Sequence, residues 1–272
     1  QPDSLSVTGV TRLIRDPYAV YAEKILRIKP LDPLRQQPDA PIAGTVIHRI
    51  LERFIKERTN LHGPQAKQQL MAITDEVLLS QAPWPAARRI WRAKVGRFAD
   101  WFLEGEVLRS ARTTDFLLEK RGEEKVGDLD ILLIAKADRL DLQDDGTVCI
   151  YDYKTGTPPS NKRQLHFEKQ LLLTAAMVEL GGFKALGHAP VSRAEYIGLG
   201  AKQEIVPAPI NQIPLKQVWA ELETLLSSYL NGGKGYTSRR AMEKMHYDYG
   251  YDHLARFGEW DTSSEPMPEV LK

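Results

Sequence analysis

The chain has 272 residues, of which 42% are hydrophobic and 27% are charged, a composition typical of ordinary globular proteins. Its 37 Lys and Arg residues against 36 Asp and Glu residues give a net charge of +1, which excludes a uniformly basic protein, so nucleic-acid binding would have to depend on local patches. Cys149 is the single cysteine. It excludes disulfides within the chain and metal sites built only from cysteines, and it fits a reducing compartment.

The sequence carries no signal for the membrane. It has no run of about 18 apolar residues and no charged-then-apolar signal peptide at its N-terminus. Because the first residue is Gln1 rather than Met, we expect a segment cut from a longer protein. We expect one domain over residues 1–272, with a helical part over about 1–112, a core over about 113–230, and a tail at 231–272 that packs back on the helical part.

The first half of the chain has mainly helical periodicity. Four prolines within residues 29–43 predict an irregular crossing segment, and a helix is expected to begin at Gly44. In that helix Ile47, Ile50 and Phe54 form an apolar stripe, while His48 lies on a neighbouring face. Further helices are predicted at residues 64–80 and 86–109.

The long helix at 86–109 has two distinct faces. Its predicted buried stripe is Ala87, Ile90, Trp91, Val95, Phe98, Trp101 and Phe102. The arginines between residues 88 and 97 lie mainly on the other face, which is either a solvated surface or a phosphate-contacting surface; the sequence leaves both open.

From Thr114 the hydrophobic period changes to that of strands. Strands are predicted at residues 116–119, 129–142, 148–153 and 193–199, with the second and third joined by the hairpin turn Asp144-Asp145-Gly146. One helix is expected from about residue 161 to 180 and another at 215–230. This order predicts an α/β fold: a mixed central sheet of about four strands flanked by helices, with extra helices inserted before the sheet.

The strand at 148–153 carries the candidate chemistry. Asp152 and Lys154 point to one face of the sheet and Tyr153 to the other, because strand side chains alternate. In isolation such a pair is more often a structural ion pair. The hairpin, however, brings Asp138 beside Asp152, and two adjacent carboxylates repel each other unless a cation lies between them. Oxygen ligands suit magnesium or manganese.

Two residues outside this hairpin are further candidates. His48 would add a nitrogen ligand from the first long helix, which favours manganese without excluding magnesium. Gln170, next to an apolar run, would project toward the strand ends. Each also has an ordinary interpretation, since a single helical histidine or glutamine is more often a surface or core residue.

Four segments together resemble a known family. GTVIH at 44–48, ADRLD at 137–141, DYKTG at 152–156 and QLLL at 170–173 occur in the order and approximate spacing of RecB-type nucleases of the PD-(D/E)XK superfamily. The resemblance covers about residues 5–200 and implies a restriction-endonuclease-like core. LSVT at 5–8, DPYA at 16–19 and YDHLAR at 251–256 are more narrowly similar to the C-terminal nuclease domain of the AddB family.

The resemblance implies a set of roles. His48, Asp138, Asp152 and the backbone carbonyl of Tyr153 would hold Mg²⁺ or Mn²⁺, Lys154 would activate the attacking water, and Gln170 would position Lys154, water or DNA. The implied function is a metal-dependent DNA exonuclease domain that acts on a single strand at a processed duplex end during double-strand break repair. Its implied partner is an AddA-type helicase–nuclease subunit in the bacterial cytoplasm.

The sequence departs from the AddB family at the ends of the domain. Many members fasten these ends with an iron–sulfur cluster held by four cysteines, whereas here Asp16 precedes Pro17 and no second cysteine exists. We therefore expect no iron–sulfur cluster. Direct packing of residues 5–30 against the tail near 236–260 should replace it, through Tyr249, Tyr251 or Trp260.

Candidate DNA contacts are Arg139, Lys162 and Arg163, together with the basic residues at 88–97 and 234–240; Trp84 or Trp91 would stack on bases. Two alternatives stay open beside the exonuclease. One is a catalytically inactive DNA-binding or scaffold module with a nuclease fold, and the other is a stand-alone RecB-like nuclease of CRISPR adaptation. A small-molecule metallohydrolase is a more remote alternative.

Overall fold

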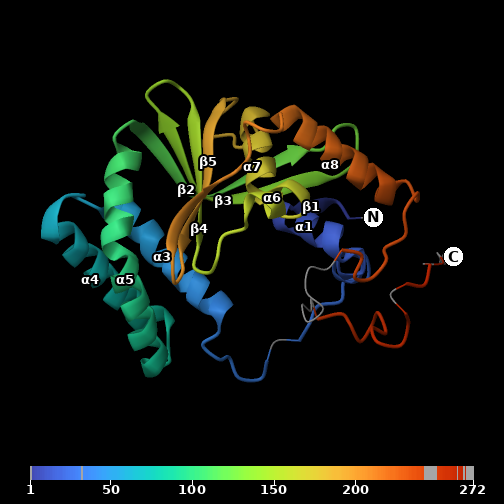
Figure 1. The fold of residues 1–272 in the computed structure, drawn as a ribbon, viewed down its shortest axis with the longest axis horizontal. Helices are drawn as coiled ribbons and strands as arrows, with labels where there is room; N and C mark the ends of the chain where they lie inside the picture. The colour runs from blue at the N-terminus through green and yellow to red at the C-terminus, as the bar shows by residue number, and fades with distance from the viewer. Residues whose placement is uncertain (1, 32, 242–249, 262, 266, 268–272) are drawn as a thin grey trace.

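A mixed sheet forms the centre of the computed structural model, which describes residues 2–31, 33–241, 250–261, 263–265 and 267 (Figure 1). Over these residues the sheet has six strands in the order β1-β3-β4-β5-β6, with β2 also paired to β3. The strands are β1 (Ser4–Ser6), β2 (Thr113–Lys125), β3 (Leu132–Gln143), β4 (Val148–Lys154), β5 (Val191–Leu199) and β6 (Gln203–Pro207).

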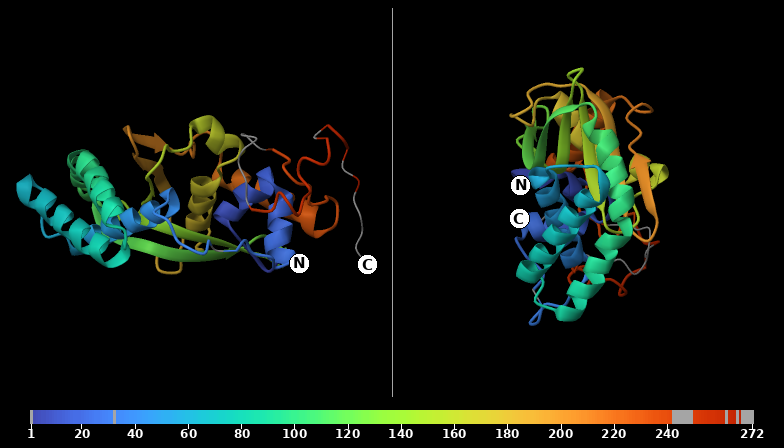
Figure 2. Two further views of the ribbon diagram at one scale, coloured as in Figure 1. Left: turned by 90° about the horizontal axis from the view of Figure 1, so that it is seen from below. Right: turned by 90° about the vertical axis from the view of Figure 1, so that its left-hand side faces the viewer.

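Helices cover both faces of this sheet, so the predicted α/β fold with a mixed, helix-flanked sheet is confirmed (Figures 1 and 2). None of the described helices is long and apolar enough to cross a membrane. The helices are α1 (Val7–Arg15), α2 (Pro17–Val20), the π-helical turn η1 (Tyr21–Ile25), α3 (Ala40–Glu57), α4 (Gly63–Gln81), α5 (Pro85–Ser110), α6 (Asn161–His166), α7 (Gln170–Glu179) and α8 (Leu215–Leu230).

The strand prediction was correct for the central strands but too low in number. β2, β3 and β4 form an antiparallel meander, β4 and β5 are parallel, and the predicted hairpin joins β3 to β4 with Gly146 at a φ of +78°. The two further strands are β1, which pairs with β3, and β6, which pairs with β5. Both are too short to show a reliable period of two, and their partners rather than their own pattern make them strands.

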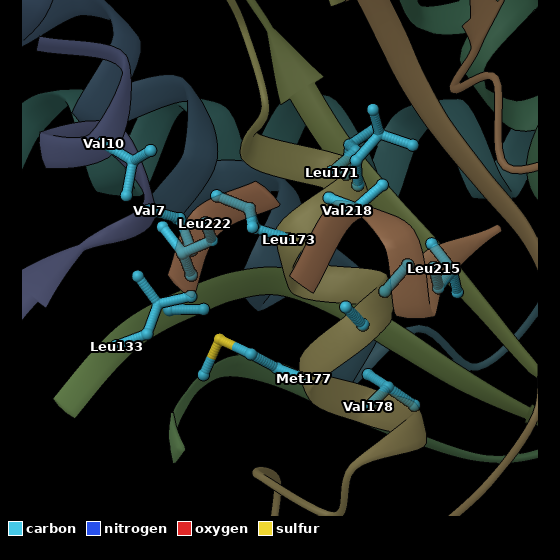
Figure 3. Packing of buried hydrophobic residues seen from close by; sticks show 14 of the residues in the cluster. Val7, Val10, Leu133, Leu171, Leu173, Met177, Val178, Leu215, Val218 and Leu222 are labelled. Carbon is cyan, nitrogen blue, oxygen red and sulfur yellow. The ribbon is translucent and has the colours of Figure 1, made fainter. Parts of the chain in front are cut away.

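The alternation along β4 sorts its side chains onto two hydrophobic cores. Val148 and Ile150 join the core formed with α1, α7 and α8, part of which Figure 3 shows around Leu173 and Met177. Tyr151 and Tyr153 join the second core, formed with α3, α4 and α5. The strand therefore ends with Tyr153 anchored in one core while its neighbours in sequence face the other side, as the sequence predicted.

Three features of the helices differ from the prediction. α3 begins at Ala40 rather than Gly44, because Asp39 caps it by accepting from the Ile42 N–H at 2.9 Å and Pro41 is tolerated in the first turn. The single helix expected at 161–180 is interrupted between α6 and α7, where Phe167 lies under the Arg15 guanidinium, 5.5 Å from it. On α5, Ile90 is 65% exposed instead of buried.

The segment after β1 packs directly against the tail, with their chains side by side in Figure 1. The Tyr18 N–H donates to the Thr237 carbonyl at 3.2 Å, and the Asp16 carboxylate accepts from the Arg239 N–H at 3.1 Å. The Arg239 side chain in turn pairs with Asp252. We call this set of contacts the terminal clasp; Asp16 lies at its centre.

Aromatic residues of the tail contribute unequally to the clasp. Tyr251 is buried against Ala19 and Ala22, and its hydroxyl donates to the Ile28 carbonyl at 2.9 Å. Trp260 is 37% exposed and donates locally to the Ala255 carbonyl. Tyr249 lies outside the described residues.

Candidate active site

The candidate site lies where β3 and β4 run side by side between α3 and α7. Arg139 pairs with Tyr151 in the antiparallel register, which sets Asp138 next to Asp152 one position further along. α3 supplies His48, and the interruption between α6 and α7 places Gln170 at the first residue of α7. All the residues that the sequence singled out for metal binding and catalysis thus approach one end of the β3–β4 pair.

His48, Asp138 and Tyr153 form one half of the site. The Asp138 carboxylate accepts from the Tyr153 N–H at 2.9 Å and lies 3.4 Å from His48 Nδ1. His48 Nε2 lies 2.7 Å from the Tyr153 carbonyl oxygen. Burial disfavours the charged imidazolium, but the hydrogen bond and negative charge of Asp138 outweigh it and raise the pKa of His48. The imidazole and the Tyr153 carbonyl, both predicted ligands, therefore share one corner of the site.

Asp152, Lys154 and Gln170 form the other half. Lys154 Nζ lies 2.7 Å from one oxygen of Asp152, and Gln170 Nε2 donates to the other oxygen at 2.5 Å. Lys154 Nζ also donates to Gln170 Oε1 at 3.1 Å. Gln170 thus ties the carboxylate and the ammonium together, which fixes their relative position.

The electrostatics of this half depend on burial. Burial raises the pKa of Asp152 to about 6, with the charge of Asp138 adding to the effect and the charge of Lys154 opposing it. For Lys154, burial disfavours the ammonium, but the Asp152 carboxylate outweighs it and raises the pKa. The Asp152 carboxylate thus favours the charged form of Lys154.

The sequence analysis missed Glu119, on β2. One ligand atom from each of His48, Glu119 and Asp138 lies within 4.8 Å of the other two, and this is the one such group of three among the described residues. Asp152 does not belong to that group, because its carboxylate faces Lys154 and Gln170. β2 pairs antiparallel with β3, which places Glu119 across from Asp138. A sequence-based prediction of this pairing would have identified Glu119.

The donor set suits a hard divalent cation. Oδ2 of Asp152 is buried and lacks a hydrogen bond of good geometry, even though the charge of Lys154 lies 2.7 Å away. The ammonium compensates the charge of this oxygen, and a carboxylate oxygen has a second lone pair that can bind another cation. Carboxylates, one imidazole and one backbone carbonyl are ligands that magnesium and manganese accept.

The prediction that Arg139 contacts DNA is wrong. Its side chain is fully buried and lies on the α5 side of the sheet, where it binds both oxygens of Asp141 at 2.6 Å and both oxygens of Glu106 at 2.7 and 2.9 Å. Lys162 is exposed on α6, and Arg163 is half-buried and lies 3.4 Å from Glu168. These two residues stay candidates for DNA contact.

Residues of α5 support the site from behind. The Tyr153 ring packs edge-to-face on Phe102, with centroids 6.1 Å apart, and on the His48 ring at 6.2 Å. Lys94, which the sequence did not single out, donates to the Thr155 carbonyl at 2.7 Å and so holds the turn that follows β4. Burial lowers the pKa of Lys94, and the charge of Arg97 adds to this.

A comparison with known protein families identifies the family to which this site belongs. Residues 4–248 match the family model described as the PD-(D/E)XK nuclease superfamily. The chain belongs to this superfamily. The superfamily is one of nucleases that use divalent metals, and the site occupies the part of the chain that the family model matches. The restriction-endonuclease-like core expected from the sequence agrees with the six-stranded mixed sheet.

Individual relatives of this PD-(D/E)XK protein are less informative. It is 30% identical over 189 residues to the uncharacterized protein RC0550 of Rickettsia conorii and 30% identical over 210 residues to the uncharacterized protein RT0391 of Rickettsia typhi. The matches cover 67% and 73% of this chain but only 23% and 24% of those proteins. The chain thus spans about a quarter of their length. The crystal structure of SSO0001 aligns with 87% of this chain and 79% of its own at 14% identity, with a TM-score of 0.38.

Proposed function

We propose that this protein is a metal-dependent DNA exonuclease domain that hydrolyses phosphodiester bonds. The observation that carries the proposal is the meeting of Asp138, Asp152 and Lys154 at one end of β3 and β4, with His48 beside the first and Gln170 bonded to the other two. A phosphodiester is negatively charged and has a poor leaving group, so hydrolysis needs strong local positive charge and an activated water.

Each residue has a role in this proposal. His48, Asp138, Asp152 and the Tyr153 carbonyl would hold Mg²⁺ or Mn²⁺, which when bound supplies a polarised phosphoryl oxygen and an acidified water. The ammonium of Lys154 offers positive charge to the scissile phosphate and a proton at Nζ. Gln170 holds Lys154 and Asp152 in one geometry through its amide.

We further propose that the domain is AddB-like and works in double-strand break repair, beside an AddA-type helicase–nuclease subunit in the bacterial cytoplasm. The order of the sequence motifs supports this, as does the match to about a quarter of much longer relatives. The terminal clasp, centred on Asp16, supports a domain whose ends are joined without iron–sulfur chemistry.

The test compares the parent protein with Asp152→Ala on linear DNA labelled at one end, and on circular single-stranded DNA. Reactions contain Mg²⁺, Mn²⁺ or EDTA and are run with and without the helicase partner. Asp144→Ala, in the exposed hairpin turn, is the matched control. We expect the parent and the control to degrade linear DNA in either metal, and Asp152→Ala to leave it intact.

Two outcomes would overturn parts of this proposal. If the parent shows no metal-dependent cleavage, alone and with its partner, the proposal that it is an enzyme is wrong. If it still binds DNA, the alternative of an inactive DNA-binding or scaffold module takes its place. If circular DNA is cleaved as fast as linear DNA, the protein is an endonuclease and the exonuclease assignment is wrong.

A further inference from the structure

Glu119 has an unusual backbone for a residue inside a long strand. Its φ is +50°, in the left-handed region, although it is neither glycine nor in a turn. Its neighbours pair regularly with β3, Leu118 with Arg139 and Lys120 with Ala137. This conformation is unfavourable for a residue with a side chain, so the contacts around Glu119 must offset its cost.

The side chain of Glu119 reaches the candidate site from β2. It lies across from Asp138, and a ligand atom of each, with one from His48, forms the group within 4.8 Å. The three side chains are 22%, 13% and 26% exposed respectively, so the group is sheltered but open on one side. Two carboxylates at this spacing repel each other unless positive charge lies between or beside them.

Lys136 supplies positive charge at this position. Its ammonium pairs with Glu119 across β2 and β3, while its side chain is 64% exposed. An ion pair whose ammonium lies largely in solvent stabilises little, less than the left-handed backbone costs. The pair alone therefore does not account for the conformation of Glu119.

We propose that Glu119 is a ligand of the divalent cation, together with His48 and Asp138, and that Lys136 is its exchangeable counter-ion. The ammonium withdraws to solvent when the cation binds, so one positive group replaces another beside Glu119. This inference rests on the proposed cation-dependent nuclease and adds a carboxylate from β2 to it. It predicts that Glu119 and Lys136 act on metal affinity in opposite directions.

The experiment measures Mn²⁺ binding to the full chain by isothermal titration calorimetry, independently of cleavage. Glu119→Gln keeps the side-chain length and removes the charge, and it should weaken binding roughly 10–100-fold, as loss of metal-site partners typically does. Lys136→Met removes the competing cation and should tighten binding several-fold. Glu123→Gln, an exposed glutamate on the same strand, is the control and should bind like the parent.

Glu119→Gly separates a ligand from a structural residue. Glycine adopts the left-handed conformation without strain, so this variant should keep the parent's Tm while its Mn²⁺ affinity falls as in Glu119→Gln. If both Glu119 variants bind Mn²⁺ as tightly as Glu123→Gln, or if Lys136→Met weakens binding, the inference is wrong.

The proposed nuclease and this inference fail separately. Suppose that the Glu119 variants bind Mn²⁺ like the parent, while the parent cleaves DNA with metal and Asp152→Ala does not. Glu119 is then not a ligand, and the proposed nuclease still holds. If Mn²⁺ binding depends on Glu119 but no DNA is cleaved, the proposed nuclease activity is wrong and the metal site still holds.

Discussion

Asp138 and Arg139 are adjacent in sequence but belong to two ionic clusters with different properties. The first cluster, the candidate site, contains His48, Asp138, Asp152 and Lys154. The second, which we call the core ion cluster, contains Arg139, Glu106, Asp141, Arg109 and Arg58 on the α5 side of the sheet.

The core ion cluster satisfies its own charges. Arg139, Glu106 and Asp141 are all fully buried, and Arg139 binds both carboxylates through two oxygens each. Burial alone would raise the pKa of Glu106, but the surrounding arginines, Arg139 first, hold it below its usual range. In the candidate site the balance is reversed, since burial raises the pKa of Asp152 to about 6.

This difference distinguishes a structural cluster from a functional one. Where arginines neutralise the buried carboxylates with good geometry, the cluster is a rigid part of the core. Where the carboxylates exceed the cations nearby, the group retains affinity for another cation. Mutations should therefore affect stability in the core ion cluster and activity in the candidate site.

The largest expected effect is on catalysis by Asp152→Asn. This change keeps the size of the side chain and removes a ligand charge, so metal-dependent cleavage should fall by more than about 10³-fold. Thermal unfolding in EDTA should give a Tm no lower than that of the parent, because a buried charge has been removed. A variant with full activity, or one that is strongly destabilised, would place Asp152 with the structural group.

Arg139→Ala should have the largest effect on stability. It leaves Glu106 and Asp141 buried without their main partner, which should cost about 3–5 kcal/mol in the free energy of unfolding measured with urea. Arg112→Ala removes an exposed arginine paired with Asp144 and should lower the free energy of unfolding far less. Equal losses in the two variants would contradict a structural role for the core ion cluster.

The two clusters should respond to pH with opposite signs. The pKa of Asp152 is raised from 3.8 to about 6, so the folded protein binds more protons between these values, and stability in EDTA should fall as pH rises through this window. The expected contribution is up to roughly 3 kcal/mol. The lowered pKa of Glu106 has the opposite sign: its stability is present above the usual pKa of 4.5 and is lost as pH falls below it.

Urea midpoints measured from pH 3 to 8 in EDTA check this difference. Asp152→Asn should remove the decrease in stability between about pH 4 and 6 and leave the acid-induced loss below pH 4.5 in place. A parallel shift of the whole curve, with its shape unchanged, would contradict the raised pKa of Asp152.

The smallest expected effect is that of Gln170→Ala. Gln170 bonds to Asp152 and Lys154 but is itself neutral, so its loss should loosen their geometry and lower the rate about 10-fold with little change in metal affinity. Gln164→Ala provides a contrast on the neighbouring helix, because Gln164 is buried and bonds to the Pro159 and Pro207 carbonyls. Gln164→Ala should lower the free energy of unfolding, and the folded fraction should cleave DNA at the rate of the parent.

Much of the site was predictable because it depends on local rules. The alternation of β4 separates Asp152 and Lys154 from Tyr153, and the Asp144-Asp145-Gly146 turn fixes which residue of β3 lies beside Asp152. The four motifs place His48 and Gln170 in the same group. These inferences need only strand periodicity, turn chemistry and the order of the segments.

Other features depend on contacts that no local pattern contains. Arg139 resembles a DNA-binding residue in sequence, and only Glu106, 33 residues earlier on α5, makes it a core residue. At the interruption before Gln170, Phe167 contacts Arg15, which comes from α1. The left-handed conformation of Glu119 is likewise invisible in the sequence, and β2 changes faces there: Leu118 packs on the α5-side core, whereas Gly122 lies against Phe183 of the other core.

The sequence by itself determined the α/β architecture, the β3–β4 hairpin and the identity of the residues beside it, because short-range periodicity and turn geometry dictate them. Only the tertiary structure decided which charges are matched. Asp138 and Arg139 differ in role because one faces the open end of the sheet and the other faces a buried glutamate on α5. Burial and pairing, which set the energy of a charge, are properties of the assembled core and not of the strand that carries it.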